Sequence, residues 1–264
     1  MRCRRMLIVL SLATPAWAAS EAPKTLSRER QMAIVAAARN VAREEDTFAA
    51  LEYLHANADA RQVVGLYSML AGGTYWKDKD LPRAVAFLRG GIQHCLRQAQ
   101  LADGSDPAAA GRFRGAAKAM AYNLGSFTWP GWGEKSIEVT RADQAVGCDA
   151  ARCTLRLARE LKQDDKPLAN AHWLVGAWQL AREEYDAAAE SFERTRTHAN
   201  NANDAALELM ARGYAAVTKI LAGQDAPAER KKLDEVVAAL KKLGTEDAKI
   251  YAPQFATVLK VFGK

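Results

Sequence analysis

Four histidines are the residues of this sequence best suited to bind a metal or to transfer protons. They stand at positions His55, His94, His172 and His198. A zinc site on a helix typically uses two histidines about four residues apart, so that both face the same side. No histidine here has a second one at that spacing. We therefore expect these side chains to cap helix ends or lie on solvated faces, with no metal and no cofactor bound.

Acidic residues are the second candidates for chemistry. Asp164-Asp165 and Glu183-Glu184 are adjacent pairs that flank breaks in helical patterns, which predicts solvated caps or turns. Glu134 lies in an irregular segment, 128–140, that is rich in tryptophan and glycine. In an alternative enzyme hypothesis, a helical cell-wall hydrolase or lyase would use Glu134 as its general acid. No nucleophile motif and no phosphate-binding glycine loop supports catalysis, so we expect a protein that is not an enzyme.

Three cysteines follow the first 18 residues, at Cys95, Cys148 and Cys153. On one regular helix, Cys148 and Cys153 would point about 140° apart, given 3.6 residues per turn. A disulfide between them therefore requires that the helix begin after Cys148. The alternative is that both are separate small core residues.

The N-terminal residues predict export. Met1–Arg5 is basic, Met6–Leu12 is apolar, and Ala16-Trp17-Ala18 supplies small residues for cleavage before Ala19. The apolar run is far shorter than the roughly 20 residues of a membrane span. We expect a signal peptide over 1–18 and a periplasmic or secreted protein, with an uncleaved interfacial anchor as the alternative. Its removal takes away three arginines and lowers the net charge from +6 to +3, which gives no support to a nucleic-acid partner.

The elements that must position these residues are helices. Apolar residues recur at helical intervals through most of the chain, and only 136–140 alternates as a strand would. The expected helices cover 28–44, 46–58, 63–75, 81–100, 108–127, 141–163, two segments within 169–202, 205–221, 228–243 and 247–262.

One pair of these helices has a more specific pattern. Within Ala169–Ala202, Gly176, Tyr185, Ala188 and Phe192 alternate small and large side chains where two helices of a hairpin would touch. This spacing resembles the tetratricopeptide repeat, a helix–turn–helix unit of about 34 residues. The resemblance implies a right-handed superhelical array of about five antiparallel hairpins, with about eleven helices in one domain over 19–264. The best repeats are 65–98, 118–163 with an insertion, 169–202 and 206–243, followed by a capping helix at 247–262.

The resemblance also implies a binding groove. The first helix of each repeat would line a concave surface through the following residues: Met69, Trp76, Tyr122, Trp129, Asn170, Trp173, Met210 and Tyr214. Trp132, in the irregular segment, would either fold back over its hairpin or touch a partner. Aromatic side chains in such a groove suit a peptide or a helix of another envelope or secreted protein. Aromatic residues at helical spacing are also typical of a core, and a third hypothesis is a self-assembling structural protein.

Overall fold

The computed structural model describes residues 25–263, and these residues are all-α. They contain eleven α-helices and no strand, which confirms the predicted fold class. The segment 136–140, the one strand candidate, is a turn followed by irregular chain. The predicted signal peptide, 1–18, lies outside the described residues.

Polar side chains at the helix starts explain why most boundaries fall where the sequence predicts them. Ser27 accepts a hydrogen bond from the backbone N–H of Arg30 at 3.1 Å, and helix α1 covers Arg28–Glu44 as expected. At the start of α6, Thr140 and Asp143 form a reciprocal capping box. Such caps satisfy N–H groups that have no partner inside the helix, so short local patterns determine where helices begin.

The helices form two compact units, which we describe separately. The N-terminal unit comprises residues 25–130 and 134–163, and the C-terminal unit comprises 131–133 and 164–263. In both units most helices pack against their neighbours in the chain. The sequence predicts a single domain, and this remains a prediction.

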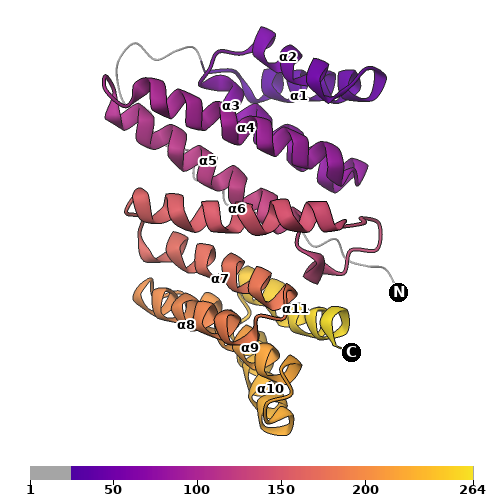
Figure 1. Ribbon diagram of the computed structural model, residues 1–264, viewed down its shortest axis with the longest axis vertical. Coiled ribbons are helices and arrows are strands. Elements are labelled where there is room, and N and C mark those ends of the chain that lie inside the picture. The colour runs from indigo at the N-terminus through magenta and orange to yellow at the C-terminus, as the bar shows by residue number, and fades with distance from the viewer. Residues whose placement is uncertain (1–24, 264) are drawn as a thin grey trace. The chain divides into compact units, whose positions relative to one another are not determined.

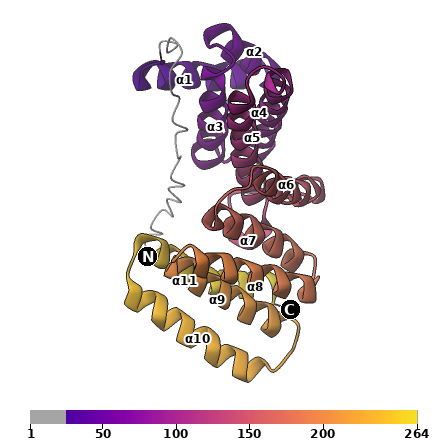
Figure 2. The same cartoon turned by 90° about the vertical axis from the view of Figure 1, so that its left-hand side faces the viewer.

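The N-terminal unit holds the first six helices, of which α3, α4 and α5 lie side by side (Figures 1 and 2). Its elements are α1 (Arg28–Glu44), α2 (Thr47–Asn57), α3 (Gln62–Gly73), η1 (Thr74–Asp78), α4 (Leu81–Ala102), α5 (Pro107–Phe127) and α6 (Arg141–Glu160). Element η1 is a π-helix that continues α3 through residues where the sequence predicts a break. Its Tyr75 is buried and stacks on Phe127 of α5, with ring centroids 4.0 Å apart. This contact holds the extra turn against the core.

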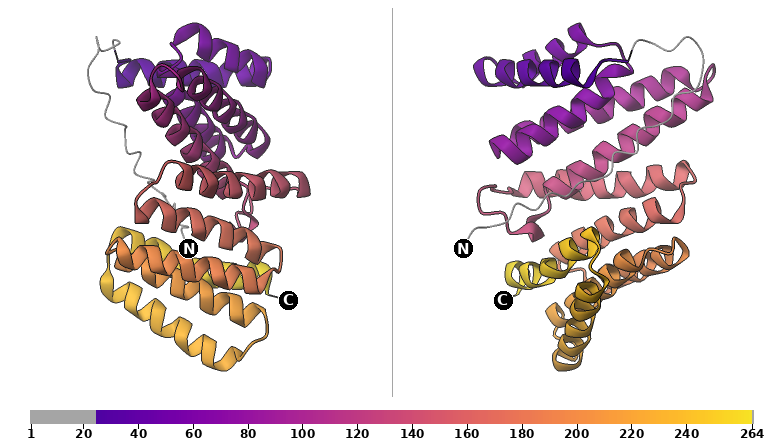
Figure 3. Two further views of the ribbon diagram at one scale, coloured as in Figure 1. Left: turned by 60° about the vertical axis from the view of Figure 1, so that its left-hand side comes forward. Right: turned by 180° about the vertical axis from the view of Figure 1, so that it is seen from behind.

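The C-terminal unit holds five helices, and its last helix lies over α9 (Figure 3). Its helices are α7 (Asp165–Ala181), α8 (Tyr185–Asn201), α9 (Ala205–Leu221), α10 (Ala226–Leu243) and α11 (Glu246–Phe262). Helix α9 contacts all four others and is therefore the central element of the unit.

Aromatic rings from four helices meet at the centre of this unit. Tyr214 of α9 contacts the rings of Trp173, Phe192 and Phe255 at centroid distances of 5.7, 5.2 and 5.5 Å. Glycines make room for these rings. A Cβ at Gly176 would lie 2.8 Å from the ring of Phe192, and one at Gly213 would lie 2.1 Å from the ring of Phe255. The predicted close approach at Gly176 and Phe192 is therefore present.

Candidate functional site

The predicted aromatic groove is not present as predicted, because four of its nine residues belong to the core. Trp129, Trp173, Met210 and Tyr214 are each exposed by 3% or less. Side chains this deeply buried cannot line a groove for a partner, so the prediction is wrong for these four residues.

These side chains are buried by packing contacts that no local sequence pattern encodes. Helix α11 packs on α9, whose Met210 and Tyr214 are both buried. Trp132 folds back within the C-terminal unit, where its ring lies 5.9 Å from that of Trp173. Gly133 allows this return with a positive φ of 60°, and a Cβ there would lie 3.1 Å from Thr257 of α11. Trp132 thus packs toward α7 and not over its own hairpin, and its contact with a partner stays a prediction.

The other predicted groove residues are at least partly exposed. Met69, Tyr122 and Asn170 are half-buried, and Met69 packs against the N-terminal core. Trp76 is 40% exposed, and the ammonium of Lys79 lies 5.6 Å from the centroid of its ring. These residues are spread over both units, and the contact of each with a partner remains a prediction.

The cysteines do not form the proposed disulfide. Helix α6 begins at Arg141 and includes both Cys148 and Cys153, so the condition for a bridge is not met, and both are free thiols. Cys95 is fully buried, and burial raises the pKa of its thiol to about 12. A thiol with so high a pKa is a poor nucleophile at neutral pH, so Cys95 has a packing role.

The histidines, although scattered in the sequence, meet in two pairs. The rings of His55 and His94 lie 5.1 Å apart, and those of His172 and His198 stack at 5.5 Å. His172 is buried, which contradicts its predicted place at a helix end or solvated face. Within residues 25–263, no three His, Cys, Asp or Glu side chains converge as metal ligands would.

Glu134 does not have the environment of a general acid. Its carboxylate accepts hydrogen bonds from the Ser136 hydroxyl at 2.7 Å and from the Lys79 ammonium at 3.3 Å. The Ser136 bond is the largest of several contributions that together lower the pKa of Glu134. A general acid at neutral pH needs a raised pKa, so this arrangement opposes the role proposed for Glu134 in the enzyme alternative.

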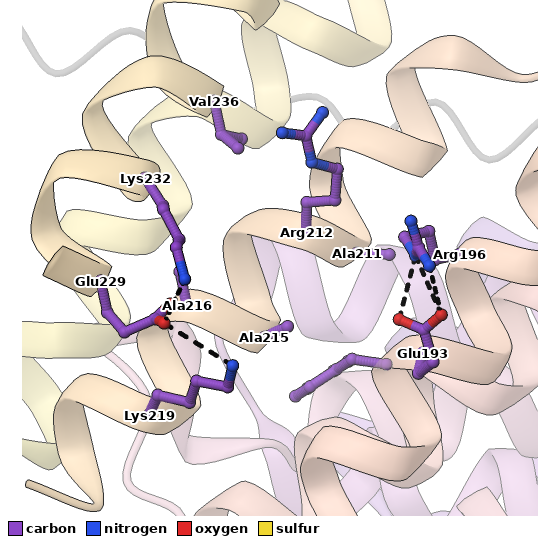
Figure 4. A pocket seen from close by; sticks show the side chains of 11 residues that line it. Glu193, Arg196, Ala211, Arg212, Ala215, Ala216, Lys219, Glu229, Lys232 and Val236 are labelled. Carbon is purple, nitrogen blue, oxygen red and sulfur yellow. Dashed lines mark hydrogen bonds and ion pairs between the residues drawn. The ribbon is translucent and has the colours of Figure 1, made fainter. Parts of the chain in front are cut away.

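A groove on the C-terminal unit is a candidate binding surface among the described residues (Figure 4). It is a hollow of about 320 Å³ over α9, with α8 on one side and α10 on the other. Three alanines of α9 lie along its floor, and Ala215 is the partly exposed one, between the buried Ala211 and Ala216. Because the side chain of alanine is only a methyl group, the surface of α9 here lies below the longer side chains of α8 and α10. Phe192 and Val236 lie beneath the groove and are themselves buried, so they support its walls without offering exposed surface.

Charged side chains surround this floor and hold one another in place. Glu229 of α10 is only 7% exposed, and it binds Lys232 at 2.7 Å and Lys219 at 3.6 Å. Burial acts to raise the pKa of Glu229, but the hydrogen bond and charge of Lys232 and the charge of Lys219 lower it overall. Glu229 is therefore ionised at neutral pH. On α8, the Nε of Arg196 donates to Glu193 at 2.9 Å.

Sequence reasoning missed this groove, although part of its signal was visible. Glu193 with Arg196, and Glu229 with Lys232, are opposite charges three residues apart, a spacing that places both side chains on one helix face. Ala211 and Ala215 are likewise neighbours on one face of α9. The missing information is the distance between α8 and α10, which depends on how both pack against α9.

None of the helices described here has the length and apolar character that crossing a membrane would need. A comparison with family models finds no match, and a comparison with curated proteins finds none either. The resemblance to tetratricopeptide repeats thus remains an interpretation of the pattern within 169–202.

Proposed function

We propose that this chain is a non-enzymatic scaffold that is exported from the cytoplasm and binds a segment of another envelope protein. The segment docks in the groove between α8 and α10. The observation that carries the proposal is this open hollow, whose alanine floor lets a peptide or a helix approach the backbone of α9. Helical arrays commonly present such surfaces to partners.

The aromatic residues of the sequence-based hypothesis have a different part in this proposal. Trp173 and Tyr214 stabilise the core that holds α9 in place, and the surface of α9 toward α8 and α10 meets the partner. The enzyme alternative loses support because the carboxylate of Glu134 is held in its ionised form.

Site-specific photo-crosslinking in intact cells tests the proposal. A photo-reactive residue replaces Ala215 on the groove floor, in a protein exported with its own N-terminal segment. Ala238, an exposed alanine of α10 that does not line the groove, is the matched control. We expect a discrete adduct with another envelope protein from position 215 and none from position 238. An adduct that contains only this chain would favour the self-assembly hypothesis, and no adduct at position 215 would contradict binding in the groove.

A further inference from the structure

Two of the four cations that line the groove lie on its floor helix. Arg212 and Lys219 lie seven residues apart on α9, so they share one face and are separated by about 10.5 Å along the axis, at 1.5 Å per residue. Their side chains are 49% and 45% exposed. Both therefore remain accessible to a partner that lies on the alanines between them.

The acids of the groove compensate these two residues only in part. Glu208 reaches Arg212 at 3.9 Å, at the outer limit of an ion pair, and it also acts on Arg196. Lys219 shares the single carboxylate of Glu229 with Lys232, and Lys232 is the closer of the two.

Among the cations of the groove, those on the floor helix have the weakest pairing with acidic side chains. Arg196 has its own partner in Glu193, and Lys232 has Asp225 and Glu235 as additional acidic neighbours. Arg212 and Lys219 have the longest ion-pair distances of the four cations around the groove. A carboxylate supplied from outside would pair with them without displacing a short ion pair.

We propose that the groove recognises an acidic segment of the partner protein, an inference that rests on the proposed function. Two carboxylates of the segment pair with Arg212 and Lys219, and a small or apolar side chain between them contacts the alanine floor. The spacing of the two cations matches residues two turns apart on a helix, or three residues apart in an extended chain, which span about 10 Å.

Selection from displayed random peptides of about a dozen residues tests the chemistry of the occupant. The bait is the full chain from residue 19 onward, and the key variant is Arg212→Gln/Lys219→Gln. The matched control is Lys241→Gln/Lys242→Gln, which removes two positive charges from the last turn of α10 instead. Circular dichroism of all three proteins verifies that the exposed substitutions leave the helices intact.

We expect the unaltered chain and the control to select peptides rich in Asp and Glu. A selected peptide should bind the groove variant at least about tenfold more weakly, which corresponds to about 1.4 kcal/mol, and its binding should weaken as salt is added. Selection of peptides without an acidic excess, selection of no peptide, or equal affinity for the groove variant would overturn the inference. These results are distinguishable from failure of the proposed function, because a partner adduct at position 215 in cells would still support binding in the groove.

Discussion

At the scale of single residues, the missing side chain of Gly176 determines how closely α7 and α8 pack. A Cβ at this position would lie 2.8 Å from the Phe192 ring, which itself contacts Tyr214 in the core. Phe192 is fully buried, so it cannot move aside without disturbing the other rings. The small residue is thus required by packing and not by backbone conformation.

Gly176→Ala should therefore lower the free energy of unfolding by about 1–3 kcal/mol, the usual cost of overpacking a core. Gly115→Ala in α5 is the matched control. A Cβ there meets nothing within 4 Å, so removal of a helical glycine should stabilise the chain by about 0.5–1 kcal/mol. Urea unfolding followed by circular dichroism measures both changes. Equal effects of the two substitutions would show that the contact with Phe192 is not restrictive.

The surroundings of His55 predict a pH-dependent contribution to stability. It shares a 2.9 Å hydrogen bond with Tyr67 and lies beside His94, and desolvation followed by the charge of His94 lowers its pKa from 6.5. The unfolded chain consequently takes up a proton more readily than the folded one. Stability from this group should be complete above pH 6.5 and decline as the pH falls through 6.5 toward the lower folded pKa. Thermal unfolding from pH 7.5 to 5 should show a smaller loss for His55→Asn, and an identical pH dependence would contradict this.

At the scale of elements, the sequence predicts the starts of the helices far better than it predicts the π-helix. Caps such as Ser27 and Thr140 act within a few residues, so α1 and α6 begin where expected. Element η1 continues past the predicted break because Tyr75 stacks on Phe127, about fifty residues away in the chain. Propensities within a short window contain no information on such a contact.

An ion pair connects this π-helix to α1. Asp78 accepts hydrogen bonds from Nε and Nη2 of Arg39, and the two side chains are only 17% and 26% exposed. Asp78→Asn leaves a partly buried guanidinium without its countercharge, so we expect a loss of about 1–3 kcal/mol. Hydrogen exchange should locate the weakened protection in α1 and η1.

The matched control is Glu160→Gln, which removes the Glu160–Arg156 pair from the surface of α6. Both side chains are about half exposed, and such pairs contribute roughly 0.5 kcal/mol or less. A cost at Asp78 no larger than that at Glu160 would argue against a structural role for the Arg39 contact.

At the scale of the whole molecule, the sequence predicts the fold class but not which faces remain open. The resemblance places Trp173 and Tyr214 on a groove only if the first helix of each hairpin is uncovered. Helix α11 packs on α9, and Trp132 returns to Trp173, and neither contact follows from the period of the repeat. The candidate groove was missed for the same reason, since its two sides come from helices that are not adjacent in the chain.

Export is the property of the whole chain that the first residues predict. The protein recovered from the periplasm or the medium should begin at Ala19, because signal peptidase requires small residues before the cut. Ala18→Phe should block processing and retain residues 1–18, whereas Ala19→Ser, after the cut, should be processed normally. Intact mass spectrometry distinguishes these forms, and a cytoplasmic protein that keeps Met1 would refute export.

The partial exposure of Trp76 gives the molecule an optical reporter of its own. Trp129, Trp173 and Trp178 are exposed by 3% or less and Trp132 is half-buried, whereas Trp76 is 40% exposed. A water-soluble quencher will therefore extinguish the fluorescence of Trp76 before that of the indoles in the core. In the chain from residue 19 onward, the light lost at low quencher concentration comes mainly from Trp76 in η1. A molecule that binds over Trp76 will shield its fluorescence from the quencher, so binding there can be followed without attaching a dye.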